Sequence, residues 1–208
     1  MKVESLIFDM DGTLWDSAKS VAESWNKVLD DLNEVKIRFT ADDIKSVMGK
    51  PMDVIAAMFF PEVDSKRQME IMNECGLYEN EYLLYHGGIL YDNLEETLKE
   101  LKKNHRLFIV SNCQSGYIEA FLEYYGFEEY FEDILCWGDN QLSKGDNIKL
   151  IMQKNSVTDA AYVGDIQADC DSARYAGIKF IHAAYGFGEV SAPDATIESF
   201  TDLPGILD

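Results

Sequence analysis

The alternation of short apolar runs with amphipathic segments predicts an α/β fold. From about residue 86 onward, four short apolar runs are bounded by turn or charged residues, as buried parallel strands are: 107–111, 133–137, 160–164 and 179–184. Residues 2–8 form one more run of this kind. Between the runs lie helical patterns at 118–125 and 167–176, each followed by a glycine that can end a helix in a left-handed conformation. This order predicts a parallel sheet with helices on both faces.

Residues 17 to about 85 have a different pattern and interrupt that core. They contain no convincing strand, and one face of the first helical segment carries Val21, Trp25, Val28, Leu29 and Leu32. The sequence TADD at 40–43 has the spacing of a capping box, so a helix is expected to start there. We therefore predict a core made of residues 1–15 and 87–208, with a helical domain at 16–86 inserted after the first strand.

The charge and cysteine content narrow the classes of partner and the location. Of the 208 residues, 18 are basic and 38 are acidic, which gives a net charge of −20 that repels nucleic acid and anionic membranes. The four cysteines form no C-x-x-C pair, so neither a zinc site nor a disulfide framework is indicated. The apolar run that follows Glu4 near the amino terminus is too short for a signal peptide or a membrane span. We predict a cytoplasmic protein with no nucleic-acid or membrane partner.

Polar residues that can carry chemistry follow the predicted strands. Ligands bind at the carboxyl ends of strands in open parallel sheets, so the residues just after each run are the first candidates. They form a short and chemically coherent set: Asp9 and Asp11, Ser111 and Asn112, Asp165 and Asp169, with Lys144 in the segment after the third strand of the core.

Asp9, Asp11 and Asp165 need a cation if the fold brings them together. Two like charges ~4 Å apart repel by about 4 kcal/mol at an effective dielectric constant near 20. A hard divalent cation removes this repulsion, and carboxylate oxygens on a loop favour Mg²⁺. Lys144 and the Ser111 hydroxyl could then hold an anion beside the cation. An acidic cluster with a metal, a lysine and a hydroxyl indicates phosphoryl transfer.

The same residues resemble the motifs of the haloacid dehalogenase superfamily of phosphohydrolases. DMDGT at 9–13, SN at 111–112, Lys144 and GDIQAD at 164–169 match the four motifs of that superfamily in order and spacing over essentially the whole chain. The helical insertion lies where the family has its type 1 cap. The resemblance implies a Rossmann-like, doubly wound parallel sheet core with an inserted α-helical cap domain.

The resemblance also implies a role for each matching residue. Asp9 would be the nucleophile that becomes an aspartyl phosphate, and Asp11 the general acid and then the general base. Asp9, Asp165 and the main-chain carbonyl of Asp11 would bind Mg²⁺, with Asp169 in support. Ser111 and Lys144 would bind the phosphoryl oxygens, and Asn112 would contact the substrate. Many relatives have a proline after this lysine where Gly145 stands here, so Lys149 and Lys154 are alternatives for the lysine.

The resemblance narrows the reaction and leaves the substrate open. Dehalogenating members lack the second aspartate, so Asp11 favours hydrolysis of a phosphate ester. The chain most resembles phosphoglycolate phosphatase-like enzymes, and VMGKP at 47–51 resembles their cap motif, which makes Gly49 and Lys50 candidate substrate contacts. The expected partner is a small phosphorylated metabolite, and the chain is expected to be a monomer or a homodimer.

Several other functions are considered beside this one. A β-phosphoglucomutase-like transferase is disfavoured because residues 17–32 contain no histidine. A nucleotidase or a pyrophosphatase on the same core stays open. The order of the motifs argues against a receiver-type signalling domain. A calcium-binding EF-hand loop is disfavoured because its register would put Ile7 and Ala18 at ligand positions. A catalytically silent binding protein is disfavoured because every expected side chain is present.

Overall fold

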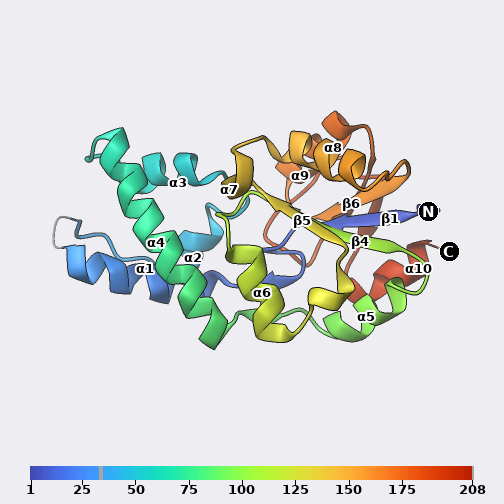
Figure 1. Ribbon diagram of the computed structural model, residues 1–208, viewed down its shortest axis with the longest axis horizontal. Helices are drawn as coiled ribbons and strands as arrows, with labels where there is room; N and C mark the ends of the chain where they lie inside the picture. The colour runs from blue at the N-terminus through green and yellow to red at the C-terminus, as the bar shows by residue number, and fades with distance from the viewer. Residues whose placement is uncertain (33–34, 208) are drawn as a thin grey trace.

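The computed structural model describes residues 1–32 and 35–207 of the chain. The strands are β1 Ser5–Phe8, β2 Trp15–Asp16, β3 Ile89–Leu90, β4 Arg106–Ser111, β5 Asp133–Cys136, β6 Ala160–Gly164, β7 Lys179–Ala183 and β8 Ala195–Ile197. The helices are α1 Ala18–Leu32, α2 Ala41–Lys45, α3 Met52–Phe59, α4 Ser65–His86, α5 Leu94–Leu101, α6 Tyr117–Tyr125, α7 Trp137–Asn140, α8 Lys144–Lys154, α9 Gln167–Ala176 and α10 Leu203–Leu207. Helices α1–α4 gather at one end of the molecule, and the sheet and both chain termini lie at the other (Figure 1).

The described residues form a six-stranded sheet in the order β5-β4-β1-β6-β7-β8, with every neighbouring pair parallel. Each predicted strand of the core is present, within three residues of its expected ends. The chain runs outward from β1 through β4 and β5, then returns to the other side of β1 to form β6, β7 and β8. Strand order therefore reverses beside β1, and ligands bind at such a reversal in open α/β sheets.

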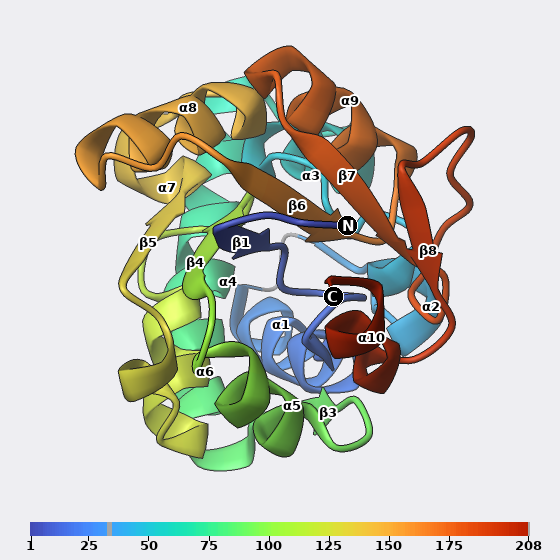
Figure 2. The same cartoon turned by 90° about the vertical axis from the view of Figure 1, so that its right-hand side faces the viewer.

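Side chains alternate between the two faces of this sheet, because successive residues of a strand point in opposite directions. Ile7, Phe108 and Tyr162 are buried in one cluster with residues of α8 and α9. Phe8 and Ile109 belong to the other cluster, which includes residues of α5, α6 and α10. Figure 2 shows the two helical layers on opposite sides of the strands. Parallel strands buried on both faces explain why the sequence has continuous apolar runs in place of an alternating pattern.

The described residues between 17 and 85 form α1–α4 and no strand, as predicted. Helix α1 buries Val21, Trp25 and Leu29 of the predicted apolar face, while Val28 and Leu32 pack against the same core at partial exposure. The capping box at the start of α2 is present, with the Thr40 side chain accepting from the Asp43 amide. Gly126 and Gly177 follow α6 and α9 with φ angles of 70° and 80°, as expected for left-handed helix caps.

The sequence pattern missed the small pair formed by β2 and β3. These antiparallel strands join the chain where it leaves the sheet and where it returns, with Trp15 opposite Leu90. Each strand has two residues, too few to produce a periodic pattern. The hydroxyl of Tyr125 on α6 donates to the Gly88 carbonyl at 2.9 Å and accepts from its amide at 3.2 Å. Helix α6 thus holds the chain at Gly88, where it returns to the sheet.

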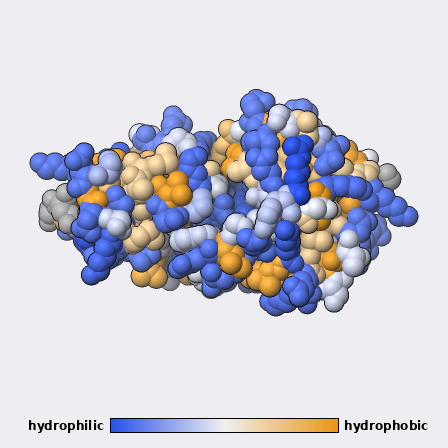
Figure 3. Space-filling model, turned by 90° about the horizontal axis from the view of Figure 1, so that it is seen from above, coloured by the Kyte–Doolittle hydropathy of each residue, from blue (hydrophilic) through white to orange (hydrophobic). Residues whose placement is uncertain are grey.

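The surface of the molecule is largely hydrophilic on one face. Hydrophilic residues cover most of the face shown in Figure 3, and apolar residues appear there in small groups. Within residues 1–32 and 35–207, no helix is long and apolar enough to cross a membrane.

Candidate active site

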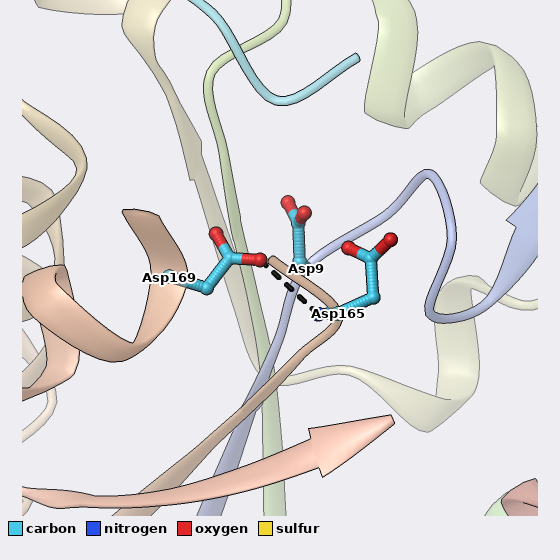
Figure 4. A group of neighbouring side chains, drawn as sticks. All are labelled: Asp9, Asp165 and Asp169. Carbon is cyan, nitrogen blue, oxygen red and sulfur yellow. Dashed lines mark hydrogen bonds between the residues drawn. The ribbon is translucent and has the colours of Figure 1, made fainter. Parts of the chain in front are cut away.

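Three buried carboxylates converge at the carboxyl ends of β1 and β6 (Figure 4). Asp9 follows β1, Asp165 follows β6, and Asp169 lies in the first turn of α9. One carboxylate oxygen from each lies within 4.8 Å of the others, and none of the three residues is more than 2% exposed. The sheet places them, because β1 and β6 are hydrogen-bonded neighbours and the Asp9 amide donates to the Val163 carbonyl at 2.9 Å.

The environment of this cluster disfavours its negative charge. The pKa of Asp165 is raised to about 8, chiefly by burial and then by the nearby carboxylates of Asp169 and Asp9, against a hydrogen bond from the Phe187 amide that lowers it. Burial also raises the pKa of Asp169, to about 6, although the Lys144 ammonium counteracts it. Converging oxygen ligands that are unfavourable as free anions suit a hard divalent cation. The donor set therefore fits the Mg²⁺ that the sequence predicted.

Lys144 contacts two aspartates of this cluster. Its Nζ lies 2.9 Å from Asp9 Oδ1 and 2.6 Å from Asp169 Oδ1, and the residue is 4% exposed. Burial alone would lower the pKa of this ammonium, but Asp169 and Asp9 raise it above its ordinary value. The lysine was expected in a loop segment; instead it is the first residue of α8, directly after the capping residue Ser143.

The two alternative lysines lie on exposed parts of α8, away from this cluster. Lys149 stands over the ring of Tyr175, with Nζ 3.5 Å from the ring centroid. Lys154 pairs with Asp133 at 2.9 Å. Of the three lysines, Lys144 is the one that the fold brings to the aspartates.

Asp11 lies beside the cluster with its side chain in a separate hydrogen-bond network. The Ser17 hydroxyl donates to Asp11 Oδ1 at 2.6 Å, and the Tyr117 hydroxyl lies 2.8 and 3.0 Å from its two oxygens. Burial raises the pKa of Asp11 to about 7 against these hydrogen bonds. A carboxyl with a pKa near neutrality can both give and take a proton there, which suits a general acid and base.

Gly12 allows the loop after β1 to approach Asp165. Its φ is +83°, and a Cβ built on it would lie 2.0 Å from Asp165 Oδ2. Both the left-handed backbone and the lack of space require glycine. The motif glycine therefore has a steric role that sequence spacing alone did not reveal.

The remaining predicted residues line one cavity of about 50 Å³ between the two halves of the molecule. Asp9, Asp11, Ser111 and Asn112 line it from the sheet, and Gly49 and Lys50 line it from the helical insertion. The Asn112 side-chain amide donates to the Gly49 carbonyl at 2.8 Å, so the two segments touch directly. All the predicted site residues thus lie at this cavity or in the aspartate cluster beneath it.

Ser17, Tyr117 and Glu79 belong to the site and were missed by the sequence reasoning. Ser17 and Tyr117 lie 100 residues apart and meet through a contact of 2.7 Å between their hydroxyl oxygens, so no local spacing connects them. Glu79 lines the cavity from α4 and is 3% exposed. Its position carried a usable signal: Met72, Cys75, Glu79 and Leu83 are buried on one face of α4 at helical spacing. A glutamate on such a face is unusual.

Comparison with known proteins agrees with the geometry. A family model for haloacid dehalogenase-like hydrolases matches residues 6–183. A phosphoglycolate phosphatase of Colwellia psychrerythraea is 30% identical over 197 residues, 88% of this chain and 85% of that protein. One from Photobacterium profundum is 26% identical over 223 residues, 99% of this chain and 96% of that protein.

Solved structures confirm the predicted fold class. A crystal structure from Haemophilus somnus, described as a predicted phosphoglycolate phosphatase, has a TM-score of 0.84 to this chain at 23% identity, covering 100% of this chain and 99% of that one. The similarity supports a shared α/β architecture.

Proposed function

The chain belongs to the haloacid dehalogenase-like hydrolase family, and on that premise we propose that it is a Mg²⁺-dependent phosphatase acting on a small phosphate monoester. The family and the named relatives indicate a phosphoric monoester hydrolase of the phosphoglycolate phosphatase-like kind. One observation supports the Mg²⁺ dependence and the reaction that we propose. Asp9, Asp165 and Asp169 converge, buried, on Lys144 beneath a cavity that Asp11 also lines.

The proposed reaction has two displacements at phosphorus. A carboxylate oxygen of Asp9 attacks the phosphorus and forms an aspartyl phosphate, while the bond to the ester oxygen breaks and the leaving alcohol takes a proton from Asp11. Asp11, now ionised, then removes a proton from water, which attacks the phosphorus and releases inorganic phosphate and free Asp9. Splitting one displacement into two explains why both steps need a group such as Asp11 that exchanges protons near neutral pH.

Asp9, Asp165 and Asp169, with the main-chain carbonyl of Asp11, would hold Mg²⁺ in this proposal. When bound, the ion supplies positive charge to the phosphoryl oxygens and permits an anionic phosphate to approach anionic Asp9. Lys144 orients the Asp9 carboxylate through their contact of 2.9 Å and leaves its ammonium beside the phosphoryl position. Ser111 and Asn112, at the end of β4, would hold the remaining oxygens.

We further propose that residues 16–86 act as a cap over a core made of residues 1–15 and 87–208. The β2–β3 pair lies at both boundaries, where the chain leaves and re-enters the core. Gly49 and Lys50 reach the cavity from the cap side and contact Asn112 of the core. A cap in this place excludes water from the phosphate and adds the residues that select the substrate. The cytoplasmic location and the monomeric or homodimeric state stay predictions.

Release of phosphate from p-nitrophenyl phosphate and a panel of small phosphoesters tests the proposal, with wild type, Asp9→Asn and Asp171→Asn measured in Mg²⁺ and in EDTA. Asp171 is an exposed acidic residue on α9, so its substitution is the matched control. Wild type and Asp171→Asn should turn over in Mg²⁺ alone. Asp9→Asn should lose about three orders of magnitude in kcat, because it removes the nucleophile. Equal turnover by Asp9→Asn, or undiminished turnover in EDTA, would refute the mechanism.

A further inference from the structure

Glu79 is a buried carboxyl in the active-site cavity for which the proposed mechanism has no use. It lies on α4, in the cap, and is 3% exposed. It lines the same cavity as Asp9, Asp11 and Ser111, so a ligand whose phosphate lies on the aspartates would bring its organic part toward the cap and Glu79.

None of the ion pairs among residues 1–32 and 35–207 involves Glu79. Lys50 also lines the cavity, but it forms no ion pair with Glu79. The pKa of Glu79 is raised to about 8, chiefly by burial and to a smaller extent by the carboxyl of Asp11. Glutamate is almost never fully buried unless it is paired, so the position calls for a partner.

The hydrogen bonds around Glu79 favour its ionised form. The indole Nε1 of Trp25 donates to Glu79 Oε2, and the Gln114 side chain is a second hydrogen-bonding partner. Both interactions lower the pKa against the effect of burial. An indole N–H can only donate, so it stabilises a carboxylate more than a neutral acid. Burial outweighs these hydrogen bonds and leaves the carboxyl mostly protonated at neutral pH, so a positive charge beside it would ionise it, and no ion pair among the described residues provides that charge.

A purely structural role explains these contacts less well. Trp25 needs only an acceptor for its N–H, and the carbonyl oxygen of a glutamine would provide one without burying an ionisable group. A carboxyl differs from that amide chiefly in the charge it can carry. The presence of an ionisable carboxyl at position 79 is therefore better explained by the charge of a ligand that binds in the cavity.

The rest of the cavity wall is suited to a short carbon chain that carries a cation. Apolar side chains from the cap line it: Val21, Trp25, Ile44, Val47, Met48, Met52 and Ile55. These exclude water, which strengthens attraction between opposite charges. An anionic group beside Glu79 would face the carboxyls of Glu79 and Asp11, and Lys50, which also lines the cavity, forms no ion pair with Glu79.

We propose that Glu79 is a specificity-determining residue that binds an ammonium group on the organic part of the substrate. The substrate class is then the phosphate monoesters of small amino alcohols. This inference rests on the proposed phosphatase function and differs from the names of the relatives, since the glycolate ester carries a carboxylate at the corresponding end.

Three two-carbon phosphoesters of matched size test this inference: 2-aminoethyl phosphate, 2-hydroxyethyl phosphate and phosphoglycolate. Phosphate release and calorimetric binding in Mg²⁺ are measured for wild type, Glu79→Gln and Glu81→Gln. Glutamine keeps the shape and the acceptor for Trp25 but not the charge, and Glu81 is an exposed glutamate of the same helix.

In wild type we expect kcat/KM for the amino ester to exceed that for the other two at least tenfold. In Glu79→Gln the ratio of amino ester to hydroxyl ester should fall at least tenfold, and in Glu81→Gln it should stay unchanged. Preference for either of the other esters in wild type, or an unchanged ratio in Glu79→Gln, would overturn the inference. If neither the three esters nor p-nitrophenyl phosphate is hydrolysed, the proposed phosphatase function fails. The binding measurements then decide the inference about Glu79. Tenfold tighter binding of the amino ester that is lost in Glu79→Gln would support it, and equal binding of the three esters would overturn it.

Discussion

The ion pairs of Lys144 join three elements at a single side chain. The ammonium lies between Asp9, at the end of β1, and Asp169, on α9, and is 4% exposed. Removing one partner of a buried ion pair leaves the other charges uncompensated, which is far costlier than losing a surface pair. Stability and catalysis should therefore both depend on this residue.

The variant Lys144→Met should lose about 3–5 kcal/mol of unfolding free energy in EDTA. Urea denaturation measures this loss. Lys149→Met is the matched control on the same helix, because Lys149 is exposed and stands over Tyr175. The control should change by less than about 1 kcal/mol. Equal losses in the two variants would show that the Lys144 pairs contribute nothing special.

The aspartate cluster should make the metal-free protein less stable as the pH rises. The pKa of Asp165 is raised from 3.8 to about 8, so the folded chain holds a proton there that the unfolded chain releases. The stabilising contribution is complete below pH 3.8 and is lost as the pH rises through about 8.

In EDTA, the melting temperature of wild type should therefore fall between pH 5.5 and 8.5. Asp165→Asn should fall less steeply and should be the more stable of the two at the upper end, because the amide carries no charge. Calorimetric scans at a series of pH values measure this. Parallel curves for the two proteins would contradict the assignment, and added Mg²⁺ should flatten the wild-type curve.

At the scale of elements, the loop after β1 packs closely against the segment that follows β6. The loop turns at Gly12 and brings the backbone against Asp165, which follows β6. The same carboxylate accepts from the Phe187 amide at 2.7 Å. Three segments of chain therefore set the position of the Asp165 side chain.

Gly12→Ala should weaken Mg²⁺ binding at least tenfold, because its Cβ would lie 2.0 Å from Asp165 Oδ2 and the carboxylate must move. Titration calorimetry measures the affinity. Gly126→Ala provides the control: its φ is also positive, at +70°, but no atom lies within 4 Å of the added Cβ. That variant should lose about 1–2 kcal/mol of stability and keep its Mg²⁺ affinity. An equal loss of Mg²⁺ affinity in the two variants would show that backbone strain, and not the contact between the new Cβ and Asp165, weakens binding.

At the scale of the whole molecule, two segments connect helices α1–α4 to the sheet. The chain crosses between them at β2 and β3, and Tyr125 of α6 holds Gly88 through both its amide and its carbonyl. Asn112 and Gly49 make a further contact across the cavity. Movement of the cap would have to loosen these contacts first.

Tyr125→Phe should speed amide hydrogen exchange at residues 14–17 and 87–91 several-fold, since each hydrogen bond contributes about 0.5–1.5 kcal/mol. Mass spectrometry after deuterium exchange measures the rates. Tyr124→Phe is the control, because the Tyr124 hydroxyl makes no hydrogen bond with the described residues. Unchanged exchange rates in Tyr125→Phe would mean that the hydrogen bonds from Tyr125 do not stabilise the β2–β3 pair.

The amino-acid sequence by itself determined the sheet, its helical layers and the place of the candidate site carboxylates. Burial on both faces makes each core strand a short apolar run, and parallel strands end at one edge, so residues such as Asp9 and Asp165 had to meet there. These properties depend on local pattern, which a sequence displays directly.

Only the tertiary structure decided which groups surround those carboxylates. Tyr117 reaches Asp11 across 106 positions, and Glu79 on α4 meets Trp25 on α1 across 54. Gly12 is required by a contact with Asp165, and Lys144 acts from the first turn of a helix. Charge compensation, pKa and cavity shape arise from contacts between segments remote in the chain, and no local pattern encodes such contacts.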